Sequence, residues 1–573
     1  MKFIFYICRL IFSTFFSYWL YYIIIKFFNP IFEASSLIFP YAVHPFDICS
    51  KIPAVWYYIK LIFKFTLFIN LFTLIFNFSS FIFPNRKKIK HKKLINKKPK
   101  KPYLYVGNNF KDNTPIYINE KGLYQNILVT GTIGSGKTSS AMYPFCKQLI
   151  KYSNNNIFDK IGMLILDVKG NFYKQVLKYA QDTNRINDVI VIELNGSYKY
   201  NPLHKPNLSP PVLANRLKTI LLLFSPNNSE SYWIDECEKV LAESIKLCRL
   251  YNNGYVTFKE IHKIITGENY YLQKINYLKQ LFRTGTLSKN EIYNLHSALL
   301  FFENEFKKLD PRTLSILKSE ITRITNVFIS NYDVLNTFCP EQNELNFLGF
   351  KEVINRGKIV VLNMNIAEHE NLSKIIAAYL KLDFQSEVLS QLSNNSQIKT
   401  TAFICDEYHE YVTLTDSNFF AQSREAKCIN IVATQSYSSL LNTLKDNSSV
   451  KVITQNLINK LWFRTDDSAT IEDAQKQIGK EEKHRVSKTI SENAKETNFN
   501  YFTGKLMSQN SNISESVNDS INFDFVYDSN FFTQNLETFS CLGFLSDGFK
   551  ILPPQKIKTI PYFLEKNNLF KKG

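Results

Sequence analysis

Residues 126–138 read NILVTGTIGSGKT, an apolar run that leads directly into the pattern G-x-x-x-x-G-K-T. The run 127–129 predicts a buried strand, and the residues after the pattern predict the start of a helix. The glycines allow backbone N–H groups to point inward at phosphate oxygens, and the helix N-terminus adds its dipole. The stretch therefore predicts an ATP site, whose loop residues are Gly131, Thr132, Ile133, Gly134, Ser135, Gly136, Lys137 and Thr138.

Two of these residues have expected roles in the chemistry of the triphosphate. Lys137 is expected to bridge the β- and γ-phosphates as a catalytic residue, and Thr138 to bind Mg²⁺.

Two apolar strands that end in acids are candidates to complete the site. Residues 401–407 (TAFICDE) put Asp406 at a strand's carboxyl end, where it can hold Mg²⁺, with Glu407 beside it as the general base. Residues 162–167 (GMLILD) end in Asp167, which is expected on a strand beside the phosphate loop, in a supporting role in nucleotide binding. The alternative for Asp406 and Glu407 is an ordinary turn at the end of a strand.

Two further residues are candidates for catalysis. Gln435 follows a third β-branched strand, 429–434, where it could sense the γ-phosphate or orient water; as an isolated residue it could equally belong to an ordinary loop. Arg424 lies between the strand 401–407 and the strand 429–434. It could reach the nucleotide of a neighbouring subunit as a finger, or it could be a solvated or salt-bridged surface residue.

The chain as a whole predicts an α/β fold. Apolar strands, including 189–192 and 359–362, alternate with helical stretches, as in a mostly parallel, doubly wound sheet with nucleotide at its carboxyl edge. Between 206 and 345 helix signals predominate, which predicts an all-α insertion. Its helix starts are marked by Thr257 with Glu260, Ser288 with Glu291, and Asp310 with Pro311.

These patterns divide the chain into six expected segments. They are a transmembrane hairpin with a basic segment (1–101), the first part of the nucleotide-binding domain (102–205), the all-α insertion (206–345), the second part of the nucleotide-binding domain (346–480), a flexible excursion (481–525) and a C-terminal return to the motor domain (526–573).

The net charge of +19 is concentrated at one end of the chain. Residues 1–101 hold 16 Lys and Arg against two acids, a charge of +14, which leaves 53 against 48, or +5, for residues 102–573. Residues 3–28 and 65–83 are apolar enough to span a bilayer, and the basic run after the second places both termini in the cytoplasm. The alternative for the first stretch is a cleaved signal peptide.

In order and spacing, these blocks resemble the type IV secretion system coupling proteins, the TraG/TraD group of conjugative ATPases. The resemblance rests on GTIGSGKT, LDVKGN at 166–171, NPL at 201–203, GKIVVLN at 357–363, and the segment from CDEYHEYV to NIVATQS that ends at 436. It implies a RecA-like motor that carries an all-α domain and assembles as a homo-hexamer at the bacterial inner membrane. Asp406 and Glu407 match the family's second nucleotide motif, and Arg424 falls where a finger acting across subunits is expected.

The resemblance implies that the chain receives single-stranded DNA with its bound relaxase and pumps it into the secretion channel. Three alternatives remain open at this stage: a motor that delivers protein effectors, a membrane receptor that docks substrates without hydrolysis, and a more distant chromosome-segregation motor of the FtsK type. Lys137, Thr138 and Glu407 disfavour the receptor, because docking needs no general base.

Overall fold

The computed structural model describes most of the chain beyond residue 100. The described residues are 101–564, without 153–158, 225–230, 268, 365, 394–396, 494–497, 501–504 and 508–511, together with the single residues 57, 61, 64, 65 and 68. They belong almost wholly to the compact unit Lys101–Leu569; the other unit is Met1–Lys100 with Phe570–Gly573.

The membrane prediction concerns the smaller of these units. None of the helices described has the length and apolar character that crossing a bilayer requires. The predicted spans 3–28 and 65–83 lie outside the described residues, apart from Phe65 and Phe68.

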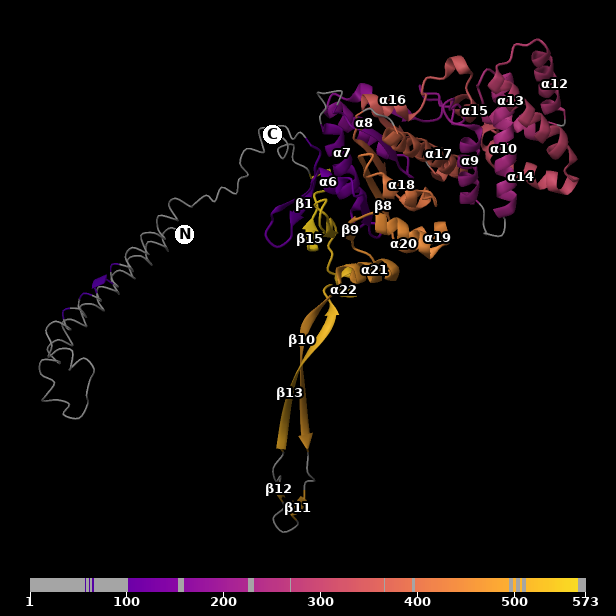
Figure 1. Cartoon of the computed structure of the whole chain (residues 1–573). Helices are drawn as coiled ribbons and strands as arrows, with labels where there is room; N and C mark the ends of the chain where they lie inside the picture. Colours follow the sequence, from indigo (N-terminus) through magenta and orange to yellow (C-terminus); the bar gives the residue numbers. More distant parts are fainter. Residues whose placement is uncertain are drawn as a thin grey trace, which may run out of the picture. The chain divides into compact units, whose positions relative to one another are not determined.

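The larger unit is built on a mixed sheet of 11 strands (Figure 1). Its parallel part runs, in spatial order, β9 (Asn459–Phe463), β3 (Ile127–Thr130), β8 (Cys428–Thr434), β7 (Thr401–Cys405), β4 (Gly162–Leu166), β6 (Ile359–Leu362) and β5 (Val189–Ile192). Antiparallel pairing then extends the sheet beyond β9 with β14 (Ser540–Phe544), β15 (Gln555–Lys558), β1 (Leu104–Asn109) and β2 (Pro115–Ile118). The predicted α/β class with a mostly parallel sheet is thus confirmed.

Alternate residues of the parallel strands enter two different cores, because successive side chains of a strand point to opposite faces. In β3, Ile127 and Val129 face one core and Leu128 faces the other. Helices α7 (Tyr143–Lys151) and α8 (Phe172–Asp182) complete the first core. The second is covered by α16 (Phe350–Arg356), α17 (Ile366–Ser393), α18 (Asp416–Gln422), α19 (Tyr437–Leu444) and α20 (Asn447–Asn456). Both faces of the sheet are therefore buried, as a doubly wound fold requires.

Seven further α-helices lie in the described chain between β5 and α16. They are α9 (Pro210–Phe224), α10 (Ser231–Tyr251), α11 (Phe258–Thr266), α12 (Tyr270–Arg283), α13 (Lys289–Leu299), α14 (Pro311–Ile329) and α15 (Tyr332–Phe338). All three predicted helix starts are confirmed: Thr257 and Asp310 accept hydrogen bonds from backbone N–H groups of the first turn, and Ser288 forms a full capping box with Glu291.

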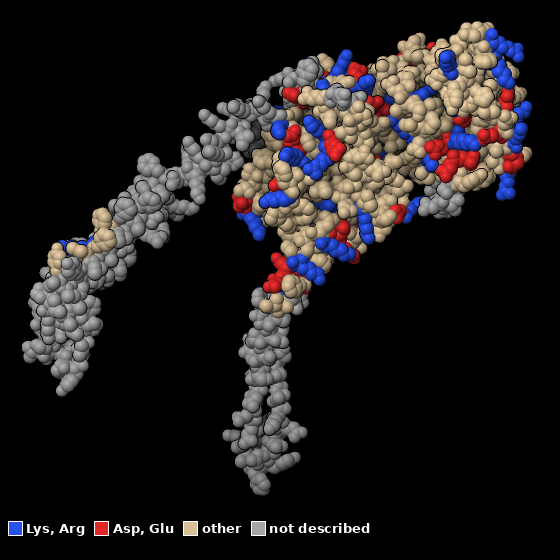
Figure 2. Space-filling view, in the orientation of Figure 1, with Lys and Arg blue, Asp and Glu red and all other residues tan. Residues whose placement is uncertain are grey.

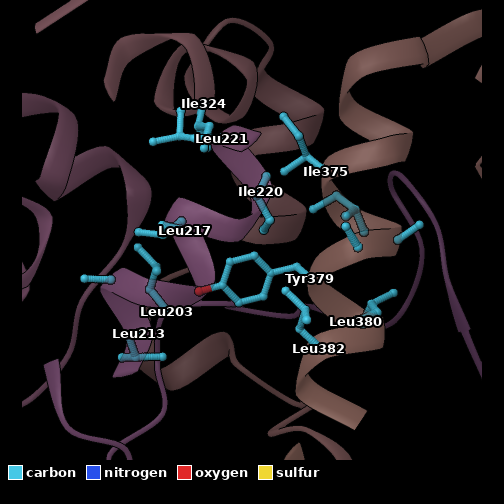
Figure 3. Packing of buried hydrophobic residues seen from close by; sticks show 14 of the residues in the cluster. Leu203, Leu213, Leu217, Ile220, Leu221, Ile324, Ile375, Tyr379, Leu380 and Leu382 are labelled. Carbon is cyan, nitrogen blue, oxygen red and sulfur yellow. The ribbon is translucent and has the colours of Figure 1, made fainter. Parts of the chain in front are cut away.

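This helical segment shares its core with the sheet through α17. In Figure 3, Leu217 and Ile220 of α9 lie close to Tyr379 of α17, and Ile324 of α14 lies beside Leu221. Since these residues are buried in the same cluster as the sheet residue Leu128, the helical segment and the sheet form one continuous core.

Two long paired strands, 480–493 and 512–525, lie where the sequence analysis predicted a flexible excursion at 481–525. Strands β10 (Lys480–Asn493) and β13 (Asn512–Phe525) pair in an unbroken antiparallel register. In the sequence between them, β11 (Asn498–Asn500) pairs with β12 (Lys505–Met507), at the far end of the long pair (Figure 1). Ile521, Phe523 and Phe525 alternate in the sequence as strand residues do. The surrounding Asn and Ser residues, which are depleted in strands, concealed this signal.

Candidate functional site

The phosphate loop lies between β3 and a helical turn, Thr138–Met142, which leads into α7. Gly134 and Gly136 have φ values of 79° and 98°, which favour glycine. The Lys137 ammonium donates to the carbonyl oxygens of Gly131 and Thr132 and is only 5% exposed. Burial lowers the pKa of Lys137, and the carboxylates of nearby acids oppose that effect. The loop thus keeps the buried ammonium of Lys137 against its own backbone. A phosphate bound in the loop needs such a positive charge close by.

Asp406 joins the phosphate loop to the end of β7. Thr138 Oγ1 donates a hydrogen bond of 2.7 Å to Asp406 Oδ2, although 268 positions separate the two residues. β8 lies between β3 and β7, and all three strands end at the same edge of the sheet because they run parallel. Burial raises the pKa of Asp406 to about 6, and the Thr138 hydrogen bond opposes this rise. The two predicted Mg²⁺ ligands are therefore in direct contact.

Glu407 adopts a backbone conformation that is rare outside glycine, with φ 50° and ψ 49°. Its N–H donates to Asp406 Oδ1 at 3.1 Å. Its side chain is buried, and Oε2 has no hydrogen-bond partner among the described residues. His409 Nδ1 lies 3.7 Å from Glu407 Oε2 and 3.2 Å from Thr434 Oγ1. The carboxylate is held in the site and keeps an oxygen available for a ligand or for water.

His409 was not singled out by sequence analysis, although it stands two positions after Glu407. Burial lowers the pKa of its imidazole, while the carboxylates of Glu407 and Glu410 oppose the shift. The contact with Glu407 makes His409 a candidate for orienting that carboxylate.

Gln435 and Arg424 lie at opposite edges of the sheet, although both flank β8. The Gln435 carbonyl accepts a 3.2 Å hydrogen bond from the N–H of Gly131, which puts Gln435 beside the phosphate loop. Arg424 is exposed in the turn that precedes the first residue of β8, so it is remote from the loop of its own chain. Its predicted action across subunits, like the roles predicted for Gln435, stays a prediction.

The expected position of Asp167 is wrong in one respect. Its strand β4 neighbours β7 and β6, and both β8 and β7 separate it from β3. The order of parallel strands depends on long-range pairing, which an apolar run does not encode. The Asp167 carboxylate accepts hydrogen bonds of 3.0 to 3.2 Å from the N–H groups of Lys169, Asn171 and Phe172. It organises its own loop before α8, and its contact with nucleotide stays a prediction.

The C-terminal segment closes on the phosphate loop from the side opposite β7. The N–H of Phe539 donates to Ser135 O at 3.2 Å, and the N–H of Tyr562 donates to Ser139 O at 2.9 Å. No local pattern in the sequence signals these contacts, because each joins residues more than 400 positions apart.

On the one face that Figure 2 draws, the charged side chains of the described residues do not single out a nucleic-acid path. On the face drawn in Figure 2, Lys and Arg side chains are interspersed with Asp and Glu over the described residues. This agrees with the near balance of charge in residues 102–573.

Comparisons with known proteins agree with this geometry. Residues 317–553 match the family model of the type IV secretion-system coupling protein DNA-binding domain. A search of curated proteins finds no match.

Among solved structures, the chain is similar to the bacterial conjugative coupling protein TrwBdeltaN70 in its unbound monoclinic form, with a TM-score of 0.53 and 11% identity over 82% of this chain and 90% of that chain. It is also similar to the plasmid coupling protein TrwB with the GTP analogue GDPNP, with a TM-score of 0.52 and 10% identity over 77% and 87% of the two chains. For TrwB with ADP and Mg²⁺, the TM-score is 0.50 and the identity 12% over 79% and 88%. These likenesses show a shared fold.

The matched residues include β7, β8 and the acidic pair Asp406 and Glu407. The resemblance to type IV secretion system coupling proteins is thus confirmed by the match of residues 317–553 to the model of their DNA-binding domain and by the shared fold.

Proposed function

We propose that this chain is a membrane-anchored, RecA-like ATPase that moves relaxase-bound single-stranded DNA into a type IV secretion channel during conjugative transfer. The observation that carries the proposal is the 2.7 Å hydrogen bond between Thr138 and Asp406, with Glu407 adjacent to it. A triphosphate on the loop would therefore lie close both to the proposed magnesium ligands, Thr138 and Asp406, and to the proposed general base, Glu407.

The residues of the site fit ATP and Mg²⁺. Lys137 would bind phosphate oxygens in place of the loop carbonyls that it now contacts. Thr138 and Asp406 would hold Mg²⁺, which when bound would neutralise charge on the phosphate oxygens. Glu407 would accept the proton of the attacking water through its buried Oε2, which has no hydrogen-bond partner among the described residues. TrwB, a protein of the same fold, has been solved with ADP and Mg²⁺ and with a GTP analogue.

The proposed working form is a homo-hexameric ring. Arg424 is exposed and far from the nucleotide site of its own chain, so a finger role requires a neighbouring subunit. Gln435 lies beside the phosphate loop and would sense the γ-phosphate. β8 would then connect this residue with Arg424 at the other end of the strand.

The proposed location is the bacterial inner membrane, with two spans at 3–28 and 65–83 and both termini in the cytoplasm. The support is the apolar length of the two stretches and the basic run after the second. This location would bring the motor next to the channel components that receive its substrate.

The decisive test is the ATPase rate of the purified full chain with and without single-stranded DNA. The proposal expects Mg²⁺-dependent hydrolysis that rises when single-stranded DNA is added, and a Lys137→Ala variant without activity in either condition. Hydrolysis that ignores DNA but responds to a secreted protein would favour protein cargo. Nucleotide binding without hydrolysis in any condition would favour the docking receptor.

A further inference from the structure

We propose that Phe539, Tyr562 and Phe563 of the C-terminal segment form an aromatic platform on which the base of the bound nucleotide stacks. The inference rests on the proposed function, because it requires a nucleoside triphosphate on the phosphate loop. It extends that function by naming the residues that would contact the nucleoside.

The order of the strands determines on which side of the loop the base should lie. β3 leads into the phosphate loop, β7 with Glu407 lies two strands away on one side, and β14 lies two strands away on the other. The general base must stand beside the γ-phosphate, where water attacks. The phosphates then run along the loop away from Glu407, so the nucleoside should leave it on the side of β14.

Phe539 and Tyr562 lie on that side and are tied by backbone hydrogen bonds to the loop and to the helical turn that follows it. Ser135 O accepts from the N–H of Phe539, and Ser139 O accepts from the N–H of Tyr562. A Cβ built on Gly136 would lie 2.6 Å from Cδ1 of Phe539, so this ring rests directly against the loop. The platform would therefore sit in contact with the loop that holds the phosphates.

Phe539 has a strained backbone, which is a second and independent observation. Its φ of 63° lies in the left-handed region, which is uncommon and unfavourable for a bulky side chain. Its carbonyl accepts from both the N–H and the hydroxyl of Thr559, at 2.9 and 2.7 Å. These bonds hold the ring against the loop despite the strain, and such strain is concentrated at ligand sites.

Phe563 provides the accessible part of the platform. Its ring centroid lies 5.9 Å from that of Phe539 and 5.4 Å from that of Tyr562, with interplanar angles of 75° and 81°. Phe563 is 59% exposed, and the adjacent Leu564 is 62% exposed. These two apolar side chains are thus open to a ligand that extends beyond the loop. A base stacked on Phe563 would cover it.

The experiment compares ligands that have and lack a base. The full chain and its Phe563→Ala variant are titrated calorimetrically with Mg-ATP, Mg-GTP and Mg-tripolyphosphate. Base stacking on an aromatic ring predicts a loss on the order of tenfold for ATP in the variant. GTP should lose a similar factor, because stacking does not read the hydrogen-bonding edge of a base. Tripolyphosphate should bind the two proteins equally, and Phe563→Trp should retain ATP affinity.

Phe549→Ala is the matched control, because Phe549 is 80% exposed and packs over Lys121, away from the loop. It should leave all three affinities unchanged. Unchanged ATP affinity in Phe563→Ala, or an equal loss of ATP and tripolyphosphate, overturns the platform. Failure of the unmodified chain to bind tripolyphosphate or to hydrolyse ATP would instead overturn the proposed function.

Discussion

Lys381 and Asp383 lie two residues apart on α17, and each is buried in a different ion pair. Lys381 Nζ lies 2.6 Å from Asp416 Oδ2 and also donates to the carbonyl of Tyr411, in the segment that follows β7. Asp383 Oδ2 lies 2.6 Å from Lys205 Nζ, and Oδ1 lies 3.1 Å from Arg216 of α9. One helix thus connects the helical segment with the loop after Glu407.

Asp383→Asn should destabilise the protein strongly, because Lys205 and Arg216 would remain buried without their counter-charge. The expected loss is about 3–5 kcal/mol, measured by urea unfolding. Glu370→Gln on the same helix removes only a surface pair with Lys374 and should cost less than about 1 kcal/mol. Similar losses in the two variants would contradict the role given to the buried cluster.

Glu407→Gln should retain ATP binding and lower turnover by at least about 100-fold, because an amide cannot accept the proton of the attacking water. Steady-state phosphate release and calorimetric ATP affinity separate the two effects. Glu410→Gln is the control, since Glu410 contacts His409 and Lys374 on the far side of the histidine. Hydrolysis at the normal rate in Glu407→Gln would reject the assignment of the base.

Gly136→Ala should impair ATP binding more than Gly134→Ala. Both positions have positive φ, so both variants carry backbone strain. At Gly136 the new Cβ would also lie 2.6 Å from the Phe539 ring, whereas nothing lies within 4 Å at Gly134. Affinities measured by titration with Mg-ATP should differ clearly between the two variants. Equal affinities would show that the Phe539 ring moves aside without a cost to binding.

A ring built only of Arg424→Ala subunits, or only of Glu407→Gln subunits, should not hydrolyse ATP. Mixed assemblies should regain activity, because a subunit with an intact Glu407 can receive Arg424 from its neighbour. The ATPase rate across a series of mixing ratios measures this recovery. Mixtures that stay inactive at every ratio would show that Arg424 does not act across subunits.

Lys460→Met should stabilise the protein at neutral pH. Lys460 of β9 is buried, and burial lowers its pKa from 10.5 to about 8, partly opposed by the charge of Asp473. Below pH 8 the ammonium is charged in both folded and unfolded states, so its burial penalty is fully present. Between pH 8 and 10.5 only the unfolded chain holds the proton, and stability therefore rises with pH.

The gain from Lys460→Met should accordingly be largest near pH 7, on the order of 2–3 kcal/mol, and should shrink toward pH 10. Urea unfolding of both proteins at several pH values checks this. A gain that is independent of pH would mean that packing, and not charge, is responsible.

Local patterns predicted the strands that carry no polar residues. The runs at 189–192 and 359–362 match β5 and β6 in full, because each is apolar throughout and, apart from Leu362, β-branched. β9 was missed because NKLWF contains Asn459 and Lys460, both buried here. The buried amide of Asn459 donates to the carbonyls of Gly122 and Asn126, and only the folded structure supplies these partners.

In the candidate site too, local patterns predicted some residues, whereas others depend on long-range contacts. Lys137 and Thr138 belong to a recognisable phosphate-loop pattern after β3, and Asp406 and Glu407 follow the recognisable strand β7 directly, so sequence alone could pair them as one site. The displacement of Asp167 by two strands, and the contact of Phe539 with Ser135, depend on which distant segments pair in the sheet. Periodicity describes the face that a strand presents, but it does not determine the neighbours of that strand.

The attachment of β14 and β15 has a consequence for biosynthesis. β9 is flanked by β3 on one side and by β14 on the other, and Phe539 and Tyr562 bond to the phosphate loop and to the helical turn after it. A ribosome synthesises the loop more than 400 residues before it synthesises these two supporting residues. A nascent chain or a product that ends before residue 539 therefore lacks these contacts, so the proposed nucleotide pocket would be completed only at a late stage of translation.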